Sequence, residues 1–444
     1  MHRRDFVRTG AAAVGGLSLG TLPSPAAAAA AGRGTPPPAT PDAIRIGLVG
    51  CGGRGTGAAV QALSTAQDVQ LVAMADAFED RVEESYGRLT GPDVGQDVDL
   101  TGRIDVPPER RFAGFDAYRR VIPLVDVVIL ATPPGFRPIH FAAAVDAGKH
   151  VFMEKPVATD APGIRAVMAA AERARADRLN VVVGLQRHYQ TVYREWVDRL
   201  HAGMIGTVVL GRVYWNSGGV WVRRRRPEQT EMEYQMRNWY YFNWLCGDHI
   251  VEQHIHNIDV ANWVLGGHPV RAQGQGGRQV RNGPDHGHIF DHHFVEFEYD
   301  GGARVLSQCR HMPDCMNRVS EAFHGTNGSA PRPGLLLSAS GHTLFEYDDD
   351  GDPNPYQVEH DELFAAVAAG RFDYADGEAG AVATMTAILG RMATYSGRVV
   401  EWDEALASEV SLMPERFAWD APPPVLPDEN GRYPVPTPGV SRVF

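Results

Sequence analysis

The chain has 444 residues, of which 44% are hydrophobic and 22% charged. This is the composition of a globular protein with two or three domains, and it excludes a wholly disordered, collagen-like or polytopic membrane protein. The net charge of −12 argues against nucleic acid or an anionic membrane surface as a non-specific partner.

Residues 1–31 have the pattern of an export signal. Arg3 and Arg4 stand before Asp5 and Phe6, an apolar run follows, and the segment ends in alanines. This order is typical of the twin-arginine route, which moves folded proteins, commonly with a cofactor inside, to the periplasm or beyond the cell. The apolar run is short for a membrane span, so we expect no membrane anchor after the signal is removed. Residues 32–42, rich in Gly and Pro, are predicted to be a linker.

A nucleotide-binding unit is predicted from residue 43 onward. The aliphatic run 44–49 indicates a buried strand, 56–66 a helix and 70–75 a second strand. Between the first strand and the helix lies a G-x-G-x-x-G motif, in which the glycines let the backbone approach a pyrophosphate at a helix N-terminus. The residues predicted here to bind the cofactor are Gly50, Gly52, Gly53, Arg54 and Gly55.

Asp76 closes the second strand, where a carboxylate can accept hydrogen bonds from an adenosine ribose. It would repel a ribose 2′-phosphate, so NAD is favoured over NADP. Arg54 and Arg81 lie close enough in the sequence to leave NADP open.

The next predicted strand, 125–132, ends in Thr132 and Pro133, and a helix with His140 follows over 136–147. A strand over 150–153 then leads into Glu154 and Lys155. Since ligands of doubly wound sheets lie beyond the carboxyl ends of the strands, Lys155 should lie beside the cofactor.

Lys155 and Lys149 are the only lysines among 42 basic residues. Codon bias explains an excess of arginine. Lysine, unlike arginine, can give up its proton when its surroundings disfavour the ammonium, so it is suited to positions that need a titratable nitrogen.

Four stretches together resemble the family of glucose–fructose oxidoreductase, inositol dehydrogenase and MocA-type proteins: GLVGCGGRG, ATPPGFRPIHFAAAVDAGKHVFMEKP, VGLQRHY and EQHIHNIDVANWVLGG. The resemblance implies an α/β protein with a Rossmann domain (43–157), whose parallel sheet is doubly wound. It also implies an α+β domain (158–420) with an open, mainly antiparallel sheet and final helices that pack back on the first domain. In this family the lysine of Glu-Lys-Pro transfers the proton, which corresponds to Lys155. The resemblance extends the expected cofactor-binding set to Thr132, Pro133, His140, Glu154, Lys155 and Gln186.

The family has an Asp-x-x-x-His pattern on a helix of the second domain, matched here by Glu252 and His256, with Asp259 one turn further on. These positions share one helix face. We therefore expect Lys155, His256 and Glu252 to be catalytic and Asp259 to contact substrate. His249, Glu252 and His256 also share a face, but HExxH is absent and we expect no metal.

The second domain is predicted to have strands over 207–214, 291–299, 303–309 and 335–340, and helices over 359–369 and 380–395. Its free sheet face would suit a homo-oligomer. The aromatic-rich segment 215–248 either grips a sugar or fills a core. The predicted substrate-binding residues are Arg187, Trp215, Asn216, Arg237, Asn238 and Asp259.

The remaining features are the histidines, the cysteines and the tail. The cluster His286, His288, His292 and His293 is expected at a surface or interface, and Cys309 and Cys315 either pair or stay free. The proline-rich residues 421–444 are expected to be irregular.

The function predicted is NAD(P)-dependent oxidation of a secondary hydroxyl of a small sugar, polyol or sugar derivative. Export would separate the protein from free NAD, so the cofactor should be retained through many turnovers. One alternative is redox-neutral cleavage of a glycoside, as in distantly related NAD-dependent glycosidases, although their Thr-His-Gly-Leu-Gly-Pro stretch is absent. The other is a sugar-binding protein with structural NAD.

Overall fold

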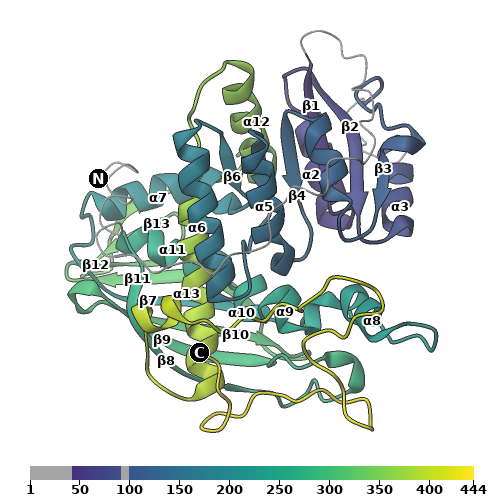
Figure 1. Cartoon of the computed structure of the whole chain (residues 1–444). Helices are drawn as coiled ribbons and strands as arrows, with labels where there is room; N and C mark the ends of the chain where they lie inside the picture. Colours follow the sequence, from purple (N-terminus) through teal and green to yellow (C-terminus); the bar gives the residue numbers. More distant parts are fainter. Residues whose placement is uncertain (1–42, 92–99) are drawn as a thin grey trace.

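The computed structural model describes residues 43–91 and 100–444, so the predicted signal and linker lie outside the described residues. Within these ranges the chain forms two sheets, one parallel and one mixed, with helices packed against them (Figure 1). The predicted α/β fold class, a doubly wound parallel sheet followed by a mainly antiparallel one, is confirmed.

The first sheet has six parallel strands in the order β3-β2-β1-β4-β5-β6. Their buried aliphatic residues read as near-continuous apolar runs because both faces are covered. The strands are β1 (Ile44–Val49), β2 (Val69–Asp76), β3 (Arg111–Ala113), β4 (Val127–Leu130), β5 (His150–Met153) and β6 (Val181–Val183). The last strand lies beyond residue 157, the predicted end of this domain, because the short run Val181–Val183 was not recognised as a strand.

Helices cover both faces of this sheet. On one face pack α2 (Gly53–Leu63), α3 (Glu79–Thr90) and, from much later in the chain, α12 (Pro355–Ala368). On the other lie α4 (Tyr118–Val121), α5 (Arg137–Asp146) and α6 (Ala161–Ala176). Asp160 caps α6 by accepting a hydrogen bond from the Gly163 N–H.

The second sheet has nine strands in the order β14-β13-β12-β11-β7-β10-β9-β8-β15, and its one parallel pair is β7 with β10. The strands are β7 (Val208–Ser217), β8 (Pro269–Gly277), β9 (His292–Tyr299), β10 (Arg304–His311), β11 (Arg318–Gly325), β12 (Gly328–Arg332), β13 (Leu335–Ser338), β14 (Thr343–Glu346) and β15 (Val400–Glu401). All four predicted strands are present, and their ends differ from the predicted ones by at most three residues.

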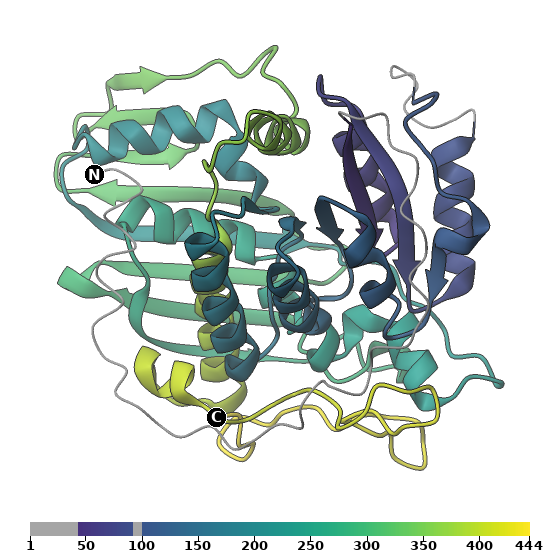
Figure 2. The same ribbon diagram turned by 45° about the horizontal axis from the view of Figure 1, so that its top comes forward.

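Helices line the inner face of the second sheet, where α13 crosses it between the two domains (Figure 2). The helices of this half are α7 (Thr191–His201), α8 (Glu231–Arg237), α9 (Asn243–Cys246), α10 (His249–Glu252), α11 (Ile255–Leu265), α13 (Gly377–Ser396) and α14 (Trp402–Ala407). No helix in the described part of the chain combines the length and the apolarity that a membrane crossing requires.

The segment after α14 has no helix or strand, yet it is packed rather than free. It runs beside α8 in both views (Figures 1 and 2). The Gln235 amide donates to the Val425 carbonyl at 2.7 Å, and the Tyr433 hydroxyl donates to Glu231. The C-terminal segment therefore belongs to the body of the molecule.

All four cysteines are free. Cys309 is buried in β10, whereas Cys315 is exposed in the following loop. A disulfide between them is therefore absent. Spacing alone could not tell that the two thiols lie in such different surroundings.

Candidate functional site

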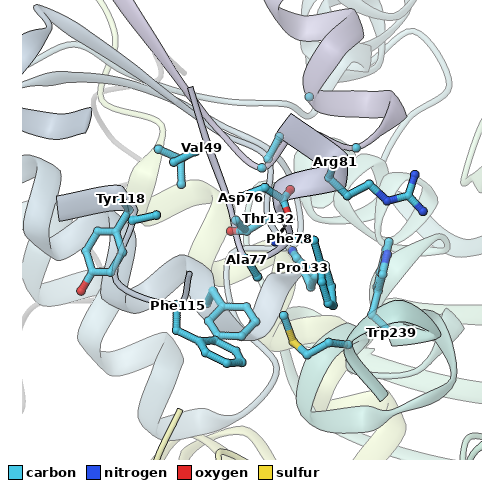
Figure 3. Close-up of a pocket in the computed structure, with 18 of the residues that line it drawn as sticks. Val49, Asp76, Ala77, Phe78, Arg81, Phe115, Tyr118, Thr132, Pro133 and Trp239 are labelled. Atoms are coloured by element: carbon cyan, nitrogen blue, oxygen red, sulfur yellow. Dashed lines mark hydrogen bonds between the residues drawn. The ribbon is translucent and has the colours of Figure 1, made fainter. Parts of the chain in front are cut away.

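A cavity of about 350 Å³ opens at the carboxyl ends of the first strands of the parallel sheet, as the topology predicts. The glycine-rich turn between β1 and α2 forms one wall. Figure 3 shows Asp76 at its centre, with Phe115 and Tyr118 on one side and Arg81 and Trp239 on the other. Of the residues expected to bind the cofactor, the lining contains Gly50, Gly52, Gly53, Arg54, Gly55, Asp76, Thr132, Pro133 and His140.

The four glycines of this turn differ in why a side chain is absent from their positions. Gly50 has φ +103° and lies so close to the backbone of Ala131 and Thr132 that a Cβ would be 2.5 Å away. A Cβ on Gly55 would lie 1.9 Å from the Gly50 carbonyl oxygen. By contrast, no atom lies within 4 Å of a Cβ built on Gly52 or Gly53. The turn thus presents open backbone to the cavity, which fits a pyrophosphate.

Asp76 is held in place by backbone donors. Its carboxylate accepts hydrogen bonds from the N–H groups of Cys51 (2.7 Å) and Phe78 (3.0 Å). Burial raises the pKa of Asp76 above its ordinary value, although these two hydrogen bonds oppose the shift. The side chain is therefore fixed at the cavity, where a ribose would lie.

His140 contributes a neutral polar group. Its Nδ1 lies 3.2 Å from the Thr132 hydroxyl, and burial lowers the pKa of His140 to about 3. Since the ring is uncharged at neutral pH, it adds no positive charge to the cavity. Its ring stacks on Phe136, which also lines the cavity.

Arg54 lines the cavity, and its guanidinium is held by two carboxylates. Its Nε donates to Glu154 at 2.5 Å, and a second nitrogen lies 3.5 Å from buried Glu359 on α12. Glu154 in turn packs against Gly184, where a Cβ would lie 2.9 Å from the carboxylate. The ion pair between Arg54 and Glu154 thus joins the glycine-rich turn to the Glu-Lys-Pro segment. Gln186 lies close after Gly184, and its Oε1 is buried without a hydrogen-bond partner among the described residues.

Lys155 follows β5 and reaches the second domain. Its ammonium donates to the backbone carbonyl of Glu252 at 2.6 Å and to the carboxylate of Glu252 at 3.1 Å. The other carboxylate oxygen is buried without a partner in the described structure. Burial raises the pKa of Glu252, and the charge of Lys155 opposes this shift.

His256 lies in the same region and is neutral, because burial holds its pKa well below the ordinary value, with the charge of Lys155 as the next cause. Its Nδ1 is buried and has no partner within the described ranges. The ring stacks on Trp215 with centroids 6.0 Å apart. The imidazole of His256, with an unpartnered nitrogen, and the aromatic face of Trp215 thus lie in the same region as the Lys155 ammonium.

The expected single helix bearing Glu252, His256 and Asp259 is wrong. The chain forms two helices, α10 ending at Glu252 and α11 beginning at Ile255. At the break the N–H groups of Gln253 and His254 both donate to the His249 carbonyl, so the regular helical pattern is lost. Asp259 is held by the His188 ring at 2.7 Å.

Two predicted substrate-binding residues have structural partners instead. Asn238 is fully buried: its amide nitrogen donates to the Asp285 carbonyl, and its oxygen accepts from the Arg223 N–H. The buried Arg187 guanidinium pairs with Glu321 of β11. The prediction for Asn238 is wrong, because both polar atoms of its side chain are already engaged. In Arg187, one guanidinium nitrogen is engaged by Glu321. Asn216 lies in β7 beside Trp215, and no partner of its side chain is recorded among the described residues.

The aromatic segment 215–248 divides between cavity and core. Trp221, Arg223, Met236, Arg237 and Trp239 line the cofactor cavity. Arg237 pairs with Asp80 at 2.8 Å and lies over the Phe78 ring, so it belongs to the cofactor side and not beside Lys155. Tyr240, Tyr241, Phe242 and Trp244 are core residues. The aromatic spacing indicated a ligand contact but could not show which ligand.

His293 is enclosed within the protein, so the surface or interface position expected for it is wrong.

The comparisons agree with this geometry. Residues 44–181 match the model of the oxidoreductase family with an NAD-binding Rossmann fold, and residues 193–330 match the Gfo/Idh/MocA C-terminal domain. Inositol 2-dehydrogenase 3 of Saccharopolyspora erythraea is 28% identical over 59% of this chain and 65% of its own length, slightly under two thirds.

Solved structures support the fold. Scyllo-inositol dehydrogenase from Lactobacillus casei, with bound NAD(H) and scyllo-inositol, has a TM-score of 0.60 at 18% identity over 81% of this chain and 99% of its own. Aldose–aldose oxidoreductase from Caulobacter crescentus, complexed with glycerol, has a TM-score of 0.60 at 19% identity over the same shares. The cavity with its glycine-rich turn is an NAD-binding site, and the chain belongs to the Gfo/Idh/MocA oxidoreductase family.

Proposed function

We propose that this protein oxidises a secondary hydroxyl of a small sugar or polyol with NAD. The observation that carries the proposal is Lys155, which lies at the carboxyl end of the parallel sheet with its Nζ between the carbonyl and the carboxylate of Glu252. Relatives named as inositol dehydrogenases support a polyol or cyclic sugar as the substrate class.

Different residues of the chain have different roles in the proposed oxidation. Lys155, in its neutral amine form, takes the hydroxyl proton and so becomes the ammonium that Glu252 holds. General acid–base catalysis requires such a group within hydrogen-bond reach. Glu252 orients the Lys155 ammonium, and the free Nδ1 of neutral His256 is available to the same hydroxyl. Trp215 offers its face to the sugar ring beside His256. When bound, NAD supplies the two-electron oxidation.

We also propose that the cofactor is retained and that it is NAD and not NADP. Trp221, Met236 and Trp239 close the cavity from the second domain. From the C-terminal segment, Trp419 packs on Phe78 and on Phe115, with centroids 4.8 and 4.4 Å apart, and both phenylalanines line the cavity. The Asp76 carboxylate disfavours a 2′-phosphate. Retention suits the proposed export to the periplasm or beyond, where free NAD is absent.

A homo-oligomer through the open sheet is part of the proposal. On the outer face of the second sheet, the exposed Phe294 of β9 (40%) lies opposite the partly buried Gln308 of β10. A second copy would cover them, and light scattering after size-exclusion chromatography measures the mass that decides this.

Two measurements on the purified full-length protein test the activity. First, any released nucleotide is identified by mass spectrometry, and we expect NAD. Second, inositols, aldoses and aryl glycosides are added while reduced nicotinamide and products are followed. Net reduced cofactor supports dehydrogenation, and return of the hydride to a second sugar supports sugar–sugar oxidoreduction. Cleaved glycoside without net reduction would establish the redox-neutral reaction, and tight sugar binding without turnover would show a binding protein.

A further inference from the structure

A second cluster of ionisable side chains lies in the second domain, behind the residues that hold Lys155. It consists of Asp248 and His249 at the start of α10 and His293 on β9. Their exposures are 0, 0 and 3%. Each offers one ligand atom, and these atoms all lie within 4.8 Å of one another. The proposed oxidation uses none of these three residues.

Asp248 adopts a backbone conformation that residues with a Cβ rarely adopt, with φ 75° and ψ 161°. Its carboxylate accepts from the Tyr395 hydroxyl (2.5 Å) and the Phe290 N–H (2.9 Å), and Nδ1 of His249 lies 2.8 Å from Oδ1. Strain of this kind persists where the surroundings over-determine it, often at functional sites. The carboxylate is thus fixed in a fully enclosed place.

The Thr394 hydroxyl contacts His293 as well as two carbonyls. It lies 2.9 Å from Nδ1 of His293, and 3.2 and 3.0 Å from the carbonyl oxygens of Gly390 and Arg391. When the hydroxyl donates to one of these carbonyls, it accepts from Nδ1, and Nε2 of the neutral ring carries a lone pair.

In that arrangement the Nε2 lone pair faces Oδ2 of Asp248 at 3.3 Å, and both atoms are shielded from water. A cation between them would stabilise both acceptors, and it would also draw His249 toward the same carboxylate.

We propose that Asp248, His249 and His293 bind one divalent transition-metal ion, with zinc the best match to two imidazoles and a carboxylate. In a tetrahedral site with metal–ligand distances of about 2.0–2.1 Å, neighbouring ligand atoms lie about 3.3 Å apart. The observed separations from the carboxylate, 2.8 Å to His249 and 3.3 Å to His293, are of this size. Thr394, Tyr395 and the Phe290 N–H orient the ligands, as outer partners do in metal sites.

His311 provides a further nitrogen donor next to this cluster. Its ring stacks on His249 with centroids 4.5 Å apart, and both of its nitrogens are buried without a partner in the described part of the chain. Buried polar atoms without partners are rare, and ordered water or an ion is a usual reason for them.

The site bears on catalysis through α10. This helix begins beside Asp248 and ends at Glu252, whose N–H donates to the Asp248 carbonyl at 2.9 Å. An ion on Asp248 and His249 would fix the helix that orients Lys155, so its role would be positioning.

The test measures metal and not turnover, so its failure is distinguishable from failure of the proposed oxidation. Full-length protein is produced in medium supplemented with zinc and analysed by elemental mass spectrometry. We expect about one equivalent per chain, with His293→Gln falling below about a tenth of it because one ligand is lost. The matched control His342→Gln changes an exposed histidine outside the cluster and should keep the full equivalent.

Because His293→Gln could impair folding, the wild-type protein gives a second readout. Cobalt supplied during growth should occupy the site and give the intense visible absorption of a low-symmetry, nitrogen- and oxygen-bound ion. Wild-type protein without metal under both conditions would show that a proton, and not a metal ion, joins His293 to Asp248, and the proposal would be wrong. Equal metal in His293→Gln and wild type would also overturn it.

Discussion

Lys155 and Lys149, the only two lysines of the chain, lie at opposite ends of β5 and make a matched pair. Lys155 →Met should lower kcat by about 10²–10⁴-fold, the usual contribution of a general acid–base group, while bound NAD is unchanged. Lys149→Met removes the same charge near Asp126 and should leave kcat within about twofold. Stopped-flow measurement of nicotinamide reduction gives both rates.

A Lys155→Met variant that reduced its cofactor at the wild-type rate would show that another group takes the proton. A variant that no longer held NAD would instead show that Lys155 binds the cofactor. Nucleotide content therefore has to be measured on the same preparation.

At this scale the strand-end rule placed Asp76 at the cavity, because topology alone brings the carboxyl ends of parallel strands to one edge. Lys155 follows β5 at the same edge but does not line the cavity. Arg187 and Asn238 could not be interpreted in the same way. The partner of Arg187, Glu321, lies 134 residues away in sequence, and the carbonyl that holds Asn238 is 47 residues away. Partners so distant leave no pattern in the sequence.

At the scale of elements, the glycines of the β1–α2 turn serve two separable purposes. Gly52→Ala should leave stability nearly unchanged, since no atom lies near the new methyl group, but weaken NAD binding because that methyl occupies the open side of the turn. Gly55→Ala should destabilise the fold by more than about 2 kcal/mol, because its Cβ would overlap the Gly50 carbonyl oxygen. Calorimetric NAD titration and urea unfolding measure the two effects.

Each variant serves as the control of the other. If Gly52→Ala unfolded as readily as Gly55→Ala, or bound NAD as tightly as wild type, the assigned division between ligand contact and helix packing would fail.

Elements with a strong apolar period were predicted almost to the residue, as β5 shows. The strands β8, β11 and β12 were missed because they contain Gly, Gln, Ser and Pro and lack a run of aliphatic residues. The break between α10 and α11 was missed because its cause is the hydrogen bonding around buried His254, whose ring contacts Ser307 and Asn257. Tertiary contacts decided these elements.

At the scale of the whole molecule, the C-terminal segment should govern how long NAD stays bound. Trp419→Ala removes two aromatic contacts, worth about 0.5–1.5 kcal/mol each, so release of NAD should be about tenfold faster with little change in the chemical step. Val440→Ala, in the same segment but 81% exposed, is the control. Nucleotide content during dialysis follows the release, and equal rates for both variants would contradict a retaining role.

The molecule as a whole should lose stability on mild acidification. Burial lowers the pKa of His140 to about 3, of His254 to about 3 and of His288 to about 4. The unfolded chain takes up protons on these rings below about pH 6.5, which the folded protein cannot do until pH 3–4, so unfolding becomes easier across that window. Each proton contributes a slope of up to about 1.4 kcal/mol per pH unit.

Urea midpoints at pH 7, 6 and 5 should therefore fall in that order. A midpoint that stayed level or rose between pH 7 and 5 would mean that these rings are protonated in the folded state.

The contact between α12 and α2 affects how this protein is made. The Gln357 amide of α12 donates to the Gln61 carbonyl of α2, 296 residues earlier, and Arg54 lies 3.5 Å from Glu359. At ~5–20 residues per second a ribosome needs about 15–60 s to bridge that interval. Until α12 has been synthesised, the surface of α2 that it covers is exposed in the nascent nucleotide-binding half. A prematurely terminated chain that lacks α12 keeps this surface exposed to proteases.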